Sequence, residues 1–207
     1  MATISDILDY VRDVTDDVGD QPRMSDAVGL RYAKRALQRA WQVIVNNNLP
    51  IGVSTQAYTT TADQQNEDLP SDFQKHIGLQ RDSTGKMLRY INVEQWARLY
   101  RAGESECTIW TILDDDIYLA STPSAAIDLT LFYWPTLDLS AYSVNTSMPW
   151  GGKLDEPIKN YLTLLALNTD EYNLDQDMAF LQEMENQIVT GLAPLEIGSL
   201  HGPVPEY

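Results

Sequence analysis

Helical periodicity at both ends of the chain, on either side of a long stretch with strand-like pattern, constrains the fold more than any other feature. Apolar residues recur at helical spacing over residues 3–18 and 25–48, and again over 153–191. Between them, short runs rich in β-branched and aromatic residues alternate with turn signals. The pattern predicts an α+β protein in which both chain ends form one four-helix bundle around an inserted antiparallel β-rich domain.

The changes of period set the predicted domain boundaries. Residues 1–49 and 153–191 are the two halves of the helical domain, and residues 50–152 are the β-rich insertion with one short helix near residues 93–101. Its strand-like runs, about six in number, fit an antiparallel sheet, a sandwich or a small barrel. Residues 192–207 contain prolines and glycines that exclude a helix, so we expect an extended C-terminal tail.

Two helix starts carry capping signals. Thr3 and Asp6 resemble a capping box, with Asp in place of the usual Glu. Ser25 is a good N-cap for the second helix, and Asp26 follows in its first turn. The sequence therefore predicts helices that begin directly after Thr3 and Ser25.

The charge is strongly negative and unevenly distributed. The net charge is −16, which repels nucleic acids and anionic membranes and argues against a sequence-reading DNA binder. Residues 1–101 hold 12 Lys/Arg and 13 Asp/Glu, whereas residues 102–207 hold 2 Lys/Arg and 17 Asp/Glu. Such asymmetry suits a head-to-tail contact between copies, and it suits simple solubility equally well.

Three arginines of the second predicted helix share one face. Arg31, Arg35 and Arg39 are spaced i, i+4, i+8. Three interpretations stay open: a solvated face, a contact with the acidic half of a neighbouring copy, and a nucleic-acid stripe that the overall charge opposes. We take these arginines as the candidate subunit interface.

Signatures of catalysis and of metal binding are missing. The sequence has no P-loop and no Gly-x-Ser-x-Gly elbow, and its two histidines and one cysteine have no zinc-like spacing. The acidic clusters fail the calcium-loop pattern and fit turns and caps. A pair formed by Cys107 and His76 is left open, although buried packing explains Cys107 better. We expect no enzymatic activity, no cofactor and no metal. A single cysteine and the lack of a signal-peptide pattern fit synthesis in a reducing compartment such as the cytoplasm.

The order of several stretches resembles a known family. SDAVGLRYAKRAL (residues 25–37) is similar to the second helix of phage adaptors, and TTTADQQ followed by LPSDF (59–73) to their first β segment. RDSTGK, MLRY and VEQW (81–96) are similar to their hairpin and short helix. The chain thus resembles the head-to-tail connector or tail-tube adaptor family of tailed phages, especially podovirus adaptors, over most of residues 3–190.

The resemblance implies a structural virion protein at the head–tail junction. It implies a homo-oligomeric ring, usually of twelve copies, docked beneath the portal protein and joined to tail or nozzle proteins, with tail fibres as further candidate partners. DNA would pass through its channel without specific binding, and no membrane is involved. The alternative is a carbohydrate- or cell-surface-binding module of a virion, built on the β insertion and its tryptophans. A small hydrolase using carboxylates is a weaker third reading.

The C-terminal tail is the predicted portal-docking segment. Its apolar side chains are too many for a segment that stays in solvent, and its prolines and glycines prevent it from burying them as a helix. An extended segment that docks into a groove of another protein resolves this conflict. The docking residues that we expect are Leu195, Ile197, Leu200, Pro203, Val204 and Tyr207.

Overall fold

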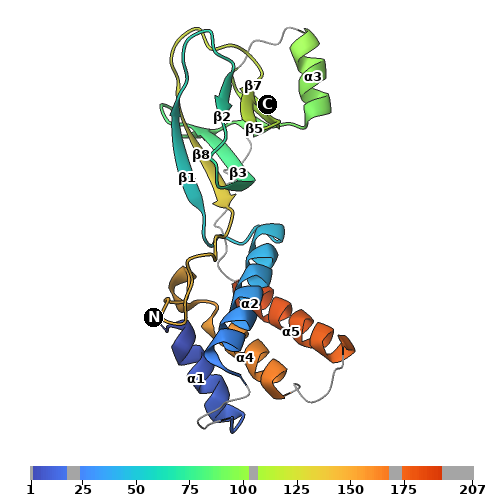
Figure 1. The fold of residues 1–207 in the computed structure, drawn as a ribbon. Helices are drawn as coiled ribbons and strands as arrows, with labels where there is room; N and C mark the ends of the chain where they lie inside the picture. The colour runs from blue at the N-terminus through green and yellow to red at the C-terminus, as the bar shows by residue number, and fades with distance from the viewer. Residues whose placement is uncertain (1, 18–23, 103–106, 168–173, 193–207) are drawn as a thin grey trace. The chain divides into compact units, whose positions relative to one another are not determined.

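A computed structural model describes residues 2–17, 24–102, 107–167 and 174–192, and it divides into two compact units (Figure 1). The helical unit consists of Met1–Ile51 and Leu137–Tyr207, and the β unit consists of Gly52–Thr136. The helical unit is therefore built from both ends of the chain, whereas the β unit is one continuous segment. In the described part of the chain, no helix is long and apolar enough to cross a membrane.

Four α-helices form the helical unit. They are α1 (Ile4–Val14), α2 (Asp26–Asn46), α4 (Asp155–Leu167) and α5 (Leu174–Leu192), with the short 3₁₀ helix η1 (Trp150–Gly152) before α4. Helix α1 packs against α2 and α4, and α2 and α4 both pack against α5. This arrangement confirms the predicted α+β fold, in which helices from the two chain ends pack together around an insertion.

Local capping chemistry explains where α1 and α2 begin. The Thr3 hydroxyl oxygen accepts a hydrogen bond from the Asp6 amide at 3.1 Å, and the Asp6 carboxylate accepts one from the Thr3 amide at 2.7 Å. These bonds hold the pKa of Asp6 below its usual value. The Ser25 hydroxyl accepts from the Val28 amide at 3.5 Å. Both predicted caps are confirmed, and α1 ends at Val14, four residues before the predicted end at residue 18.

The segment between the β unit and η1 also belongs to the helical unit. The first amides of α1 donate to it, Ile4 to the Thr146 carbonyl at 3.0 Å and Ser5 to the Val144 carbonyl at 2.7 Å. These bonds satisfy amides that have no partner inside the helix. The β unit accordingly ends at Thr136, whereas the sequence analysis placed residues 137–152 in the insertion.

The contact between α1 and α2 depends on a glycine. A Cβ added to Gly29 would lie 2.6 Å from a methyl carbon of the fully buried Leu8. The same junction is closed by Arg12, whose guanidinium donates to the Met24 carbonyl at 2.9 and 3.0 Å and to the Asp26 carboxylate at 2.6 Å. The start of α2 is thus attached to α1 by close packing and by a charged hydrogen-bond network.

Two four-stranded sheets and one helix form the β unit. The strand orders are β1-β8-β3-β4 and β2-β7-β6-β5. The elements are β1 (Ser54–Thr59), β2 (Asn66–Asp68), β3 (Phe73–Arg81), β4 (Lys86–Met87), β5 (Arg89–Tyr90), α3 (Val93–Ala102), β6 (Ile109–Leu113), β7 (Asp116–Leu119) and β8 (Asp128–Pro135). The sequence left open a single sheet, a sandwich and a small barrel. The structure has two separate four-stranded sheets, so it is neither a single sheet nor one closed barrel.

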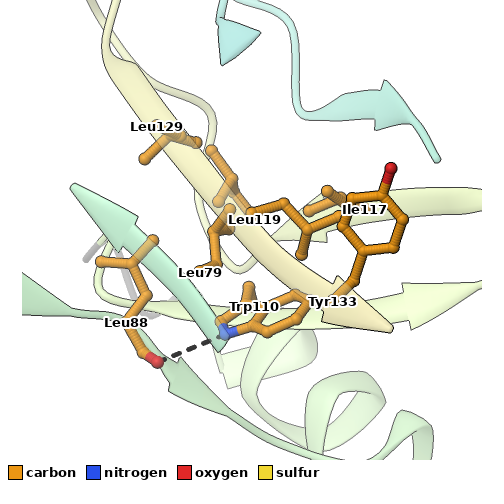
Figure 2. Packing of buried hydrophobic residues seen from close by; sticks show 8 residues of the cluster. Leu79, Leu88, Trp110, Ile117, Leu119, Leu129 and Tyr133 are labelled. Atoms are coloured by element: carbon orange, nitrogen blue, oxygen red, sulfur yellow. Dashed lines mark hydrogen bonds between the residues drawn. The ribbon is translucent and has the colours of Figure 1, made fainter. Parts of the chain in front are cut away.

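The two sheets share one hydrophobic core, drawn in Figure 2. Trp110 of β6 is completely buried in this core, and its indole N–H donates to the Leu88 carbonyl at 3.3 Å. Leu88 lies between β4 and β5, where the chain leaves one sheet and enters the other. The remaining core residues come from both sheets: Leu79, Ile117, Leu119, Leu129, Leu131 and Tyr133.

Two features of the second sheet differ from the sequence prediction. Strand β2 is a polar segment without strand-like pattern, and it is ordered by pairing with β7. Strand β5 pairs in parallel with β6, so the insertion is not purely antiparallel. Residues 87–91, one of the strand-like runs of the sequence, are divided between the two sheets at Leu88. Periodicity carries no information on such a change of pairing partner.

Candidate interaction surfaces

The arginine face of α2, formed by Arg31, Arg35 and Arg39, is exposed on the helical unit. The opposite face of α2 is buried and supplies Ala33, Ala36, Leu37, Ala40, Trp41 and Ile44 to the core. The core therefore fixes the orientation of α2 and directs the three arginines toward solvent.

One of the three arginines has a partner in its own chain. The Arg39 side chain donates to the Glu185 carboxylate of α5 at 2.5 Å, and these side chains are 48% and 19% exposed. A pair this exposed contributes about 0–1 kcal/mol. Within the described part of the chain, Arg31 and Arg35 form neither a hydrogen bond nor an ion pair, so they are the two arginines that remain available to a partner.

The end of α5 lies further along the chain than the sequence analysis placed it. The helix continues through Gly191 to Leu192, which is only 6% exposed and belongs to the core. Leu192 is thus not part of a tail. A shallow groove of about 260 Å³ between α4 and α5 is lined by Gly191, Leu192 and five further residues, Lys153, Glu156, Pro157, Gln187 and Ile188. The portal-docking candidates Leu195, Ile197, Leu200, Pro203, Val204 and Tyr207 lie outside the described residues.

The candidate cysteine–histidine pair finds no geometric support. The thiol of Cys107 contacts the Ser121 hydroxyl at 2.9 Å. The His76 ring lies 4.1 Å from the Tyr90 ring and 5.3 Å from the Trp110 ring, measured between centroids. Burial, with a smaller contribution from Lys75, lowers the pKa of His76. This histidine is therefore an aromatic packing residue of the β unit.

Tryptophans of the β unit offer little surface to a carbohydrate. Trp110 is fully buried and Trp134 is 3% exposed, with the Lys75 ammonium 5.6 Å from its ring centroid. Trp96 packs edge-on against Tyr118 at 5.7 Å. The stacking platform that a glycan-binding module requires is not presented by Trp110 or Trp134.

A basic groove on the β unit was missed in the sequence. Arg89 of β5 and Arg98 of α3 line a groove of about 330 Å³ together with Ile91, Gln95, Leu99 and Ile109. Both arginines are exposed, and neither forms an ion pair with the described residues. They are nine positions apart in the sequence, so only the docking of α3 beside β6 brings them together. Among the described residues, no group of acidic, histidine and cysteine side chains is arranged to hold a metal ion.

The chain matches a known family over nearly its whole length. The family model described as SU10 adaptor protein matches residues 2–196, which is nearly the whole chain. No curated protein matches the sequence.

Proposed function

Because this chain belongs to the SU10 adaptor protein family and is a phage head–tail adaptor, we propose that it forms a ring between the portal protein and the tail. The ring holds twelve copies, as the resemblance to podovirus adaptors implies. Tail or nozzle proteins bind its other side, and tail fibres are candidate partners there. The protein acts as a structural component of the virion, not as an enzyme.

The observation that carries the ring is the arginine face of α2. A chain with a net charge of −16 keeps Arg31 and Arg35 exposed and without an ion pair among the described residues. In a ring, this face would meet acidic residues of the adjacent copy. Charge pairs of this kind set register and association rate more than affinity.

The internal pair of Arg39 and Glu185 refines this interface. Since Glu185 belongs to the acidic half of the chain, part of the charge asymmetry is already used within one copy. The intermolecular part of the proposed contact is therefore centred on Arg31 and Arg35, with Arg39 orienting α5 beside them.

Portal attachment is the proposed role of residues 193–207. Helix α5 ends at the buried Leu192, so the helical unit gives this segment a fixed point of departure. Its apolar residues then reach grooves of the portal protein, and ring formation raises the effective concentration of each tail once the first has docked. The acidic composition of the ring lets DNA pass without tight phosphate contacts.

Purified protein added to portal-bearing heads that lack the adaptor tests this function. Electron microscopy should show a ring of adaptor density at the portal vertex, with twelve-fold symmetry. Binding elsewhere on the head, or as isolated copies, would contradict the proposal.

Two variants separate the two proposed contacts. Arg31→Glu/Arg35→Glu should lower the number of copies per head, more so at low salt, while Gln38→Glu on the same helix is the control for added negative charge. Deletion of residues 193–207 should leave the melting temperature unchanged and abolish attachment to heads. Normal attachment of the truncated protein would exclude the tail from the mechanism.

A further inference from the structure

The sheet β2-β7-β6-β5 ends in two edges of different character. At the β5 edge lie the basic groove and its two unpaired arginines, Arg89 and Arg98. At the β2 edge lie Glu67 and Asp68, and next to them Asp116 begins the neighbouring strand β7, directly after the turn residues Asp114 and Asp115. Because β2 and β5 are the outer strands of one sheet, the two charges lie on opposite sides of it.

The β5 edge has the composition of a protein interface. Tyr90 of β5 and Val93 at the start of α3 are among the large apolar residues that the described part of the chain exposes, at 40% and 42%. Tyr and Arg are residues that interfaces favour over the remaining surface. This edge therefore combines apolar area with positive charge.

The main chain of the β5 edge is also free to pair. The amides of Arg89 and Ile91 donate to the carbonyls of Thr108 and Trp110, at 2.8 and 3.0 Å. Both amides thus point toward β6. Strand geometry then directs the N–H and C=O of the intervening Tyr90 away from β6, where they can pair with a further strand.

The β2 edge concentrates negative charge. Asp68 and Asp116 are opposite each other in the β2–β7 register, and the Leu69 amide donates to the Asp115 carbonyl at 2.8 Å. None of the acids at 67, 68 and 114–116 forms an ion pair with a described Lys or Arg. Burial and the neighbouring Asp68 raise the pKa of Glu67, as expected for a carboxylate without a cation beside it.

We propose that the β5 edge of one copy binds the β2 edge of the next copy, with Arg89 and Arg98 facing the acids of β2 and of the β6–β7 turn. This inference rests on the proposed ring. The partner is a second copy of this chain because the same sheet carries both complementary edges. A contact between two different patches is heterologous and repeats from copy to copy, which is the symmetry that closes a ring. The outward carbonyls of Asn66 and Asp68 on β2 already accept bonds from the Gln64 side-chain amide at 2.9 Å and from the Tyr58 hydroxyl at 3.0 Å. The contact therefore depends on the apolar area of the β5 edge and on the charges, which supply register.

Disulfide cross-linking tests the contact directly. In a Cys107→Ser background, one chain carries Tyr90→Cys and another carries Glu67→Cys. Both are assembled together on portal-bearing heads and oxidised. Dimers should form in the mixture and not with either chain alone. A chain that carries both cysteines should give a ladder of oligomers. Intrachain bonding is excluded because three strand spacings, roughly 14 Å, separate β5 from β2, well beyond the reach of a disulfide.

Charge reversal tests the role of the two edges. Arg89→Glu/Arg98→Glu should reduce cross-linking at least tenfold, and adding Asp68→Arg/Asp115→Arg to the same chain should restore it. Lys86→Glu, a like charge change on β4, should have no effect. Restoration would identify the partner as another copy, since an unrelated partner would not tolerate both reversals.

Separate outcomes distinguish this contact from the proposed function. Full rings on heads without cross-links would overturn the edge-to-edge contact and leave the ring intact. Cross-links from Tyr90→Cys to a tail protein would overturn the choice of partner. Failure of the unmodified chain to bind heads would contradict the proposed function itself.

Discussion

The helical unit and the β unit differ in how far along the chain their stabilising contacts reach. In the helical unit, α1 and α2 pack against α4 and α5, which are separated from them by the entire insertion. In the β unit, every strand and the whole core lie within Gly52–Thr136. The comparison indicates that the β unit can fold alone, whereas each half of the helical unit depends on the other.

Dividing the chain should give the largest effect. A fragment of residues 52–136 should retain a cooperative thermal transition and a buried Trp110, because its core is complete. Residues 1–51 alone should be largely unfolded, because the buried face of α2 would lose α4 and α5. Circular dichroism and tryptophan fluorescence measure both. A stably helical fragment of residues 1–51 would show that this half of the helical unit does not depend on α4 and α5.

Truncation of the central aromatic residue should affect only one unit. Trp110→Ala removes a fully buried side chain and its hydrogen bond to Leu88, so the β unit should lose about 3–5 kcal/mol of unfolding free energy. Native-state hydrogen exchange would report the loss for amides of β3, β6 and β8, with little change in α1. Equal losses in both units would show that they unfold as one.

Two leucines of α4 should differ in how much they stabilise the helical unit. Leu162 is fully buried, whereas Leu165 is only partly buried although it lies on the same apolar stripe. Leu162→Ala should cost about 2–5 kcal/mol, and Leu165→Ala clearly less. Chemical denaturation of the two variants gives the difference. The opposite ranking would place the core on another face of α4.

Two glycines of the helical unit should respond in opposite directions. Gly29→Ala forces a methyl group against the buried Leu8, so it should destabilise the helical unit by about 1–3 kcal/mol. Nothing lies within 4 Å of a Cβ added at Gly191, so Gly191→Ala should be neutral or should stabilise α5 by up to about 1 kcal/mol. Melting temperatures of the two variants measure this contrast.

Acidification should weaken the β unit slightly through His76. Since burial lowers the pKa of His76 in the folded protein, the unfolded chain takes up the proton first. The contribution of neutral His76 is complete above its unfolded pKa, near 6.5, and is lost as the pH falls below that value. His76→Phe should therefore flatten stability between pH 7 and 5. An unchanged profile would show that other groups titrate there.

The parts of the fold that the sequence could predict are those fixed by near neighbours. Thr3 and Ser25 begin helices because their hydroxyls bond to amides three residues further along. The acidic cluster that begins at Asp114 marks a turn between β6 and β7, in which Asp114 has a φ of 54° and Asp116 already belongs to β7. In each case the interacting residues are at most a few positions apart, so the local sequence is sufficient to predict the cap or the turn.

Contacts between distant residues could not be predicted in the same way. Arg39 and Glu185 are 146 positions apart, so the sequence marked an exposed arginine face without showing that one arginine is used internally. The two-residue strand β5 pairs in parallel with β6 because the chain leaves the first sheet after β4 and enters the second at β5. The sequence does not show where this change of sheet occurs. The basic groove was missed for the same reason, since Arg89 and Arg98 become neighbours only when α3 docks.

The bonds between the start of α1 and the segment after the β unit set an order for folding during synthesis. The amides of Ile4 and Ser5 find their acceptors, Thr146 and Val144, only after some 140 residues have followed. Until then the first helix emerges from the ribosome with an incomplete cap and without α4. The β unit is complete at residue 136, so it can fold before the N-terminal helices have the segments against which they pack. A phage adaptor built this way finishes its helical unit last, so the arginine face of α2 becomes rigid only in a fully synthesised chain.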